Sequence, residues 1–161
     1  MARPTTIPFK DFILKIGDGE TPEVLGKPCG LTSQGLNFTK ETNEVQVPDC
    51  DDPDLAAATE RAVTATSATF TGEGILAAEF LPDWWDFYNY NGSRNCTIEL
   101  VSTVNGGTWA GKFILTGFNV TANLGEKVGV AVEMLSDGVI TFTPAVLLMT
   151  AGAGDELAEA A

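Results

Sequence analysis

The last third of the chain constrains its fold more than any other part of the sequence. Between Thr108 and Pro144, strand-length segments with alternating apolar and polar side chains are separated by two compact turn sequences, Asn123–Glu126 and Ser136–Gly138. Such alternation is typical of an antiparallel meander that buries one of its two faces. Between the two turns we expect one set of alternate residues to face the core, namely Val128, Val130, Val132 and Met134. Glu133 would then face outward.

Shorter strand patterns occupy much of the remaining sequence. We expect strands over residues 11–16, 33–39, 62–71 and 95–103, joined by turns and loops rich in glycine, proline and asparagine. One helix begins near Pro82, a residue suited to the first helical turn. This order predicts a mainly β protein, an antiparallel β-sandwich or barrel with one flanking α-helix. We expect one domain over residues 1–145 and a partly mobile C-terminal tail over residues 146–161.

The expected helix carries an aromatic stripe. Leu81, Trp84, Trp85 and Tyr88 follow the i, i+3, i+4, i+7 spacing of one helix face, and we expect this face to pack against the sheet. The alternative is an exposed platform of Trp84 and Trp85 that stacks on sugar rings, as in a carbohydrate-binding β-sandwich.

A polar and acidic segment separates the second and third expected strands. Residues 40–61 include six carboxylates of interest: Glu41, Glu44, Asp49, Asp51, Asp52 and Asp54. Apart from a short strand over residues 44–47, we expect a long exposed loop, because its centre has too few apolar side chains to pack. A calcium site is disfavoured because Pro53 occupies a ligand position and the EF-hand glycine and terminal glutamate are missing. The segment is better explained as a solvated or partner-facing loop.

Composition narrows the function. Nine Lys and Arg residues stand against 22 Asp and Glu residues, a net charge of −13, which argues against a protein that grips nucleic acid through phosphates. The absence of histidine removes the usual Ser–His and Cys–His nucleophile pairs and the commonest transition-metal ligand. Three widely spaced cysteines, Cys29, Cys50 and Cys96, are expected to be reduced. A glycosidase needs two carboxyl groups that face each other across a cleft, and nothing in the sequence points to such a pair. We therefore expect a non-enzymatic protein without a cofactor, and no apolar run is long enough to span a bilayer.

The order of these elements resembles that of the tail tube (major tail) proteins of long-tailed, non-contractile bacteriophages. The resemblance covers residues 5–145 and is carried by the segments DFILKIGDG, GLTSQGLNF, EVQVPDCDDPD, ATFTGEG and FLPDWWDFYNY and by the closing meander. It implies a β-sandwich that assembles as a hexameric ring, in which the inner strands of six subunits surround a lumen. Stacked rings would form the tube through which phage DNA passes during ejection, without specific binding.

The resemblance also implies partners and roles for individual residues. The subunits would contact one another and the tape-measure, tail-terminator and tail-tip proteins, in a virion assembled in the bacterial host cytoplasm without membrane contact. The acidic segment with its six carboxylates would contact the next ring. Four further charged residues are expected at the lumen or at subunit interfaces: Glu99, Lys112, Glu126 and Glu133. A closed ring would also cover strand edges that otherwise promote aggregation.

Overall fold

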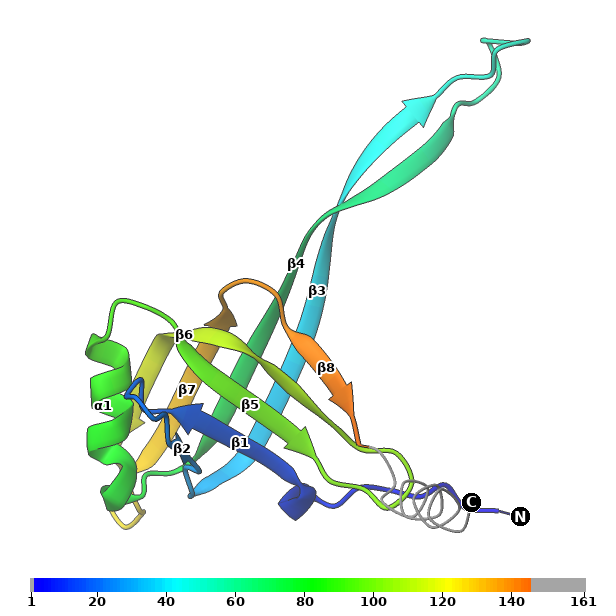
Figure 1. Cartoon of the computed structure of the whole chain (residues 1–161). Coiled ribbons are helices and arrows are strands. Elements are labelled where there is room, and N and C mark those ends of the chain that lie inside the picture. The colour runs from blue at the N-terminus through cyan, green and yellow to red at the C-terminus, as the bar shows by residue number, and fades with distance from the viewer. Residues whose placement is uncertain (1, 146–161) are drawn as a thin grey trace, which may run out of the picture.

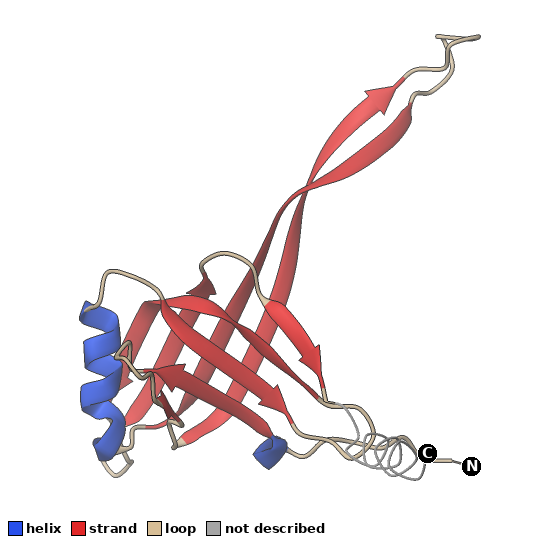
Figure 2. Ribbon diagram, in the orientation of Figure 1, coloured by secondary structure: helices blue, strands red, loops and turns tan. Residues whose placement is uncertain are grey.

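The computed structural model describes residues 2–145, so the expected tail over residues 146–161 lies outside the described residues. The helical elements are η1 (Phe9–Asp11), η2 (Ala78–Phe80) and α1 (Leu81–Asn89). The strands are β1 (Phe12–Gly17), β2 (Leu25–Gly26), β3 (Leu31–Val47), β4 (Ala58–Ile75), β5 (Arg94–Leu100), β6 (Gly107–Thr121), β7 (Gly129–Ser136) and β8 (Thr141–Pro144). Figure 2 shows that strands dominate the described chain and that α1 lies at one end of them. The prediction of a mainly β protein with one flanking helix is confirmed.

The strands form one continuous antiparallel sheet that folds over itself at β6. The strand order is β2-β1-β5-β6-β7-β4-β3, and β8 also pairs with β6. The first half of β6 pairs with β5, and its second half pairs with β7 after an irregularity between Leu115 and Gly117. In Figure 1 the layer with β1 and β5 crosses the layer with β4 and β3 at an angle. The result is a sandwich whose two layers share one strand.

One hydrophobic core joins the two layers. Its buried side chains come from both, and include Leu14 of β1, Ile98 of β5, Phe70 of β4 and Met134 of β7. Burying a side chain of this size contributes about 1.5–3 kcal/mol relative to leaving it exposed. The sandwich therefore depends on contacts between residues far apart in the sequence.

The predicted face of β7 is confirmed within the strand itself. Val130, Val132 and Met134 are buried, whereas Glu133 is exposed. Val128 precedes the strand and is exposed, so the buried alternation begins at Val130, two residues later than expected.

The acidic segment is a β-hairpin and not a loop, which corrects the prediction for residues 40–61. β3 and β4 remain paired along their length, as far as Val47 opposite Ala58, so only residues 48–57 connect them. Figure 1 shows this hairpin extending far beyond the sandwich. We call residues 39–67 the arm; every residue in it is exposed. The prediction failed because a strand pair without a buried face has no simple apolar alternation.

The last strand also lies elsewhere than a simple meander predicts. β8 pairs with the first half of β6, with Trp109 opposite Phe142, instead of adding to β7. The free edge of β7 is already occupied by β4, from Thr69 to Ile75. The expected strand over residues 95–103 likewise ends earlier, at Leu100, where its pairing with Gly107 ends.

Candidate assembly surfaces

The arm has one largely apolar face and one polar face. Because directly paired residues of antiparallel strands share a face, Val47 lies beside Ala58, and Val45 lies beside Glu60. Val45 and Val47 are 54% and 40% exposed. On the opposite face, Arg61 forms an exposed ion pair with Glu44, its cross-strand neighbour. A ribbon with an apolar face that no other part of residues 2–145 covers is suited to contact with another molecule.

The carboxylates at the end of the arm organise its turn. The Oδ1 atom of Asp49 accepts hydrogen bonds from the backbone N–H groups of Asp51 (2.8 Å) and Asp52 (3.1 Å). These bonds hold the pKa of Asp49 below its usual range, because they stabilise the ionised carboxylate. Asp52 accepts in turn from the N–H of Asp54 at 3.3 Å. The tip, residues 48–57, is therefore an acidic but ordered turn.

The six carboxylates predicted for ring stacking all lie on the arm, but not at one point. Glu41 and Glu44 belong to β3, and the other four belong to the tip, namely Asp49, Asp51, Asp52 and Asp54. In the part of the chain that the structure describes, no group of three His, Cys, Asp or Glu side chains is arranged to hold a metal ion.

The helix contacts the core through a different face from the one predicted. Trp84 and Phe87 are 3% and 1% exposed, and Trp84 stacks on Phe118 of β6 with 6.5 Å between ring centroids. The other three residues of the predicted stripe are about half exposed: Leu81 at 42%, Trp85 at 51% and Tyr88 at 47%. Since α1 contacts the sheet only at one end of the sandwich, a narrow strip of the helix is enough to cover it. Phe87 is not one of the four residues of the predicted stripe, and its i+3 spacing from Trp84 is the sequence signal that the two share a helix face.

The exposed residues of α1 do not form the expected double-tryptophan platform. Trp85 stacks on Tyr88 at 5.7 Å. Trp84 belongs to the core, so a sugar cannot stack on both tryptophans. The carbohydrate-binding alternative depended on an exposed platform of both tryptophans, and the structure does not contain that platform.

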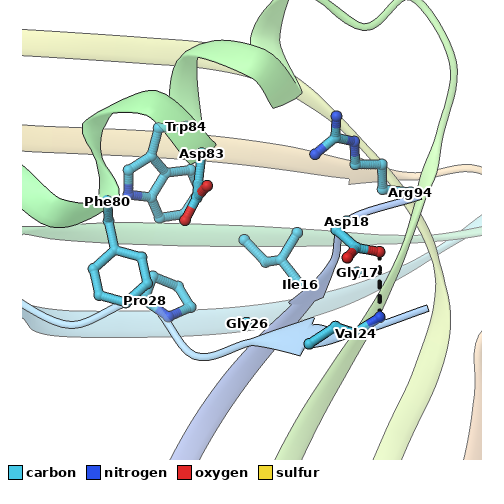
Figure 3. Close-up of a pocket in the computed structure, with 10 residues that line it drawn as sticks. All are labelled: Ile16, Gly17, Asp18, Val24, Gly26, Pro28, Phe80, Asp83, Trp84 and Arg94. Atoms are coloured by element: carbon cyan, nitrogen blue, oxygen red, sulfur yellow. Dashed lines mark hydrogen bonds between the residues drawn. The ribbon is translucent and has the colours of Figure 1, made fainter. Parts of the chain in front are cut away.

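A pocket lies between α1 and the end of β1. Figure 3 shows Trp84 and Phe80 on one side of it and Ile16 and Gly26 on the other, and Pro28 also lines it. It has a volume of about 250 Å³. This apolar pocket is exposed at the end of the sandwich that carries α1.

Charged groups surround the same pocket. Asp18 accepts a hydrogen bond from the N–H of Val24 at 3.2 Å, drawn in Figure 3, and another from the N–H of Glu20 at 3.0 Å. These backbone bonds lower the pKa of Asp18, so it stays ionised. The Arg94 guanidinium lies 5.4 Å from the ring centroids of both Phe87 and Tyr90.

The four charged residues predicted for the lumen or interfaces are not brought together. Glu99 pairs with Lys15 at 2.9 Å, and Lys112 is exposed on β6. Glu126 accepts a hydrogen bond from Asn123 within the β6–β7 turn, and Glu133 lies on β7. Glu99 and Lys112 share one outer face of the sandwich, whereas Glu133 lies on the other outer face and Glu126 lies in a turn.

A distinct acidic surface covers the outer side of the β3-β4-β7-β6 layer. We call it the acidic face. The strand registers place Glu73 beside Ser33 and Ala131, and Thr71 between Gly35 and Glu133. The full set, read across the paired strands, is Ser33, Gly35, Asn37, Thr69, Thr71, Glu73, Ile75, Gly129, Ala131, Glu133, Leu135, Ile114, Gly117, Asn119 and Thr121. It contains two carboxylates and no Lys or Arg.

The outer side of the opposite layer, which contains β1 and β5, carries cations as well as a carboxylate. Lys15 and Glu99 pair there, and Lys112 lies opposite Asn95. The two outer faces of the sandwich therefore differ in charge. Glu73 lies on the acidic face, and the sequence analysis did not include it among the candidate lumen residues.

A β-sandwich that carries a long exposed hairpin is typical of a protein that assembles with other molecules. It is less typical of a protein with an enclosed active site. The family model described as phage tail tube protein matches residues 6–142 of the chain. The chain therefore belongs to the phage tail tube protein family, which confirms the predicted resemblance, and its role in the phage tail is structural. No curated protein matches the sequence.

Solved structures share the fold at low sequence identity. A chain from the tail of an empty gene transfer agent particle, with C6 symmetry, matches with a TM-score of 0.69 and 17% identity, covering 86% of this chain and 99% of that one. A chain of the sheath–tube complex of an extracellular contractile injection system gives a TM-score of 0.59 and 16% identity, with coverage of 87% and 93%. The SPP1 tail tube gives 0.59 and 7% identity, with coverage of 89% and 83%. The fold thus occurs in a contractile system as well.

No helix among residues 2–145 is long and apolar enough to cross a membrane.

Proposed function

We propose that this protein assembles as hexameric rings that stack into the tail tube, and that phage DNA passes through the lumen during ejection. The observation that carries the proposal is the long exposed arm on a tail tube sandwich, since such a ribbon needs a partner surface. The C6 symmetry of the gene transfer agent tail supports six subunits per ring. Assembly in the host cytoplasm, and contacts with tape-measure, tail-terminator and tail-tip proteins, belong to the same proposal.

The arm would contact the adjacent ring in the stack. Its length carries the tip well beyond the sandwich of its own subunit (Figure 1). Its apolar face, with Val45 and Val47 on β3 and Ala58 and Ala62 on β4, would be covered in that contact. Isolated two-stranded ribbons are marginally stable in water, so docking would also stabilise the arm itself.

The acidic face would line the lumen. Two carboxylates per subunit, Glu73 and Glu133, without a neighbouring cation give this surface a negative potential. Small and uncharged polar residues fill most of the remaining positions, which offers DNA few groups to bind. The opposite outer face carries Lys15 and Lys112 and would attract phosphates more strongly. Repulsion acts over a Debye length of about 8 Å at physiological salt and would keep DNA sliding.

Electron microscopy of the concentrated purified protein tests the proposal. We expect rings or tubes whose end-on views have sixfold symmetry and a central channel. A preparation that stays monomeric over the accessible concentration range, by light scattering as well as by microscopy, would contradict it.

A further inference from the structure

The N-terminal segment, residues 2–10, differs in chemistry from the rest of this acidic protein. It carries Arg3 and Lys10 and no carboxylate. All of its residues are exposed, including two large apolar ones, Ile7 at 39% and Phe9 at 53%. It is cationic and apolar at once, and the rest of residues 2–145 leaves both its charges and its apolar side chains exposed.

Local sequence keeps most of this segment extended. Pro4 and Pro8 fix their own backbone angles and disfavour the helical conformation of the residues before them. Pro8 has φ −74° and ψ 158°, which is the extended region. A segment that is already extended loses less conformational entropy when it binds, which is why proline-containing strands often bind in aromatic-lined grooves.

The pocket beside α1 has the complementary chemistry. Its walls include Ile16, Phe80 and Trp84, and the carboxylates of Asp18 and Asp83 lie at its edge (Figure 3). Neither carboxylate forms an ion pair with a cation of residues 2–145. Arg94, the cation beside them, is held against two aromatic rings. The pocket therefore offers an apolar cavity with unpaired negative charge at its edge.

The segment and the pocket lie at opposite ends of the same molecule. β1 connects them, with η1 and the N-terminal segment before Phe12 and the pocket residues Ile16 and Asp18 at its other end. In Figure 1 the N-terminal segment runs away from the sandwich on the side opposite α1. A ring built from one kind of subunit joins unlike surfaces in this way, because each subunit presents one surface to each neighbour.

We propose that the N-terminal segment of one subunit binds in the α1 pocket of a neighbouring copy in the same ring. Apolar side chains of the segment, Ile7 or Phe9, enter the cavity, and its two cations pair with Asp18 and Asp83. The inference rests on the proposed ring, and it adds the pair of surfaces that closes it.

Disulfide trapping in the full-length chain tests this contact directly. The exposed cysteines are first removed by Cys29→Ser and Cys50→Ser. Val24→Cys then places a thiol at the pocket, and Thr5→Cys or Thr6→Cys places one in the segment. We expect mild oxidation to give a ladder of covalent oligomers that ends at the hexamer, since disulfides form only when the two Cα atoms approach within about 7 Å.

A matched control replaces the pocket thiol with Leu124→Cys, in the fully exposed β6–β7 turn. The control should give no ladder. Rings in the microscope without a ladder from either segment position would refute the contact while leaving the ring intact. A protein that forms no rings would overturn both proposals.

Charge reversal provides an independent readout. Arg3→Glu with Lys10→Glu should raise the protein concentration needed for half-maximal ring assembly by about tenfold or more, as expected for losing central contacts of an interface. Lys127→Glu, an exposed cation in the β6–β7 turn, outside both the segment and the pocket, should change it by less than about twofold. Adding Asp83→Lys to Arg3→Glu should recover part of the loss. Equal effects of Lys127→Glu and of the double substitution Arg3→Glu with Lys10→Glu would contradict the proposed pairing.

Discussion

Trp84 and Trp85 are neighbours in the sequence with opposite roles. Trp84 is buried against Phe118 and helps to hold α1 on the end of the sandwich. Trp85 points to the surface and stacks on Tyr88. One step of about 100° around the helix separates a core residue from a surface residue.

Alanine substitution of the two tryptophans should lower the stability of the protein by different amounts. We expect Trp84→Ala to lower the free energy of unfolding by about 3–5 kcal/mol, because it leaves a cavity in the core. Trp85→Ala should cost less than about 1 kcal/mol, since it removes an exposed side chain. Urea denaturation followed by circular dichroism measures both, on samples kept below the assembly concentration. Similar losses for the two variants would contradict this assignment.

The three cysteines should differ in reactivity. Cys29 and Cys50 are exposed, whereas Cys96 is buried in the core. Burial raises the pKa of the Cys96 thiol to about 12, so the reactive thiolate is scarce at neutral pH. We expect two thiols to react rapidly with a maleimide at pH 7 and the third to react only after denaturation. Mass spectrometry of the labelled protein gives the count, and rapid labelling of Cys96 would contradict its burial.

The same reagent reports on assembly. If the tip contacts the next ring, Cys50 should react more slowly in tubes than in the dispersed protein. Cys50→Ser identifies its contribution to the labelling.

The arm is the element on which stacking of rings should depend. It extends beyond the core, so its end can change without affecting the buried residues of the sandwich. The apolar face and the acidic tip belong to the same arm. A contact made by the arm would therefore bury apolar side chains and also favour a partner surface of complementary charge.

Deleting residues 49–54 should leave a folded protein that no longer forms tubes. The deletion removes the Asp49 turn while leaving the core intact. We expect a far-UV spectrum and a urea midpoint close to those of the full chain, with no tubes by microscopy. Tubes of normal length from the deleted protein would refute the role of the tip.

At the scale of the element, the sequence was a good guide wherever a strand buries one face. The alternation of apolar and polar residues in β7 correctly predicted which side chains face the core, because successive side chains of a strand point to opposite faces. The arm buries neither face, so its composition looked like that of a loop. The sequence placed Glu44 on a short strand, and only the pairing of β3 with β4 shows that Glu41 lies on the same strand.

The whole molecule separates charge between its surfaces. The acidic face has Glu73 and Glu133 and no cation, whereas the opposite outer face has Lys15, Lys112 and Glu99. The N-terminal segment adds Arg3 and Lys10. Net charge alone, at −13, does not reveal this separation. A tube made from such subunits would present different potentials to its lumen and its exterior.

Reversing the charge of the acidic face should slow the passage of DNA. In phage particles assembled with Glu73→Lys and Glu133→Lys subunits, we expect slower or incomplete ejection, because lysines in the lumen would bind phosphates. The delay should shrink as salt increases. Dye fluorescence of the released DNA measures the time course.

The control for this prediction carries the same change in net charge outside the acidic face. Glu126→Lys with Asp137→Lys alters two turn residues, and ejection should remain normal. Unchanged ejection from the first variant would refute the assignment of the acidic face to the lumen.

The sequence by itself determined the mainly β class, the position of α1, the inward face of β7 and the resemblance to tail tube proteins. Each of these follows from local patterns, since alternation and helical turn signals act over a few residues. The tertiary structure decided that residues 40–61 form an arm, that β8 pairs with β6, that Phe87 rather than Trp85 enters the core, and that Glu73 and Glu133 share one face. These depend on which strands meet, and the free energy that selects the pairing comes from burying residues distant in the sequence.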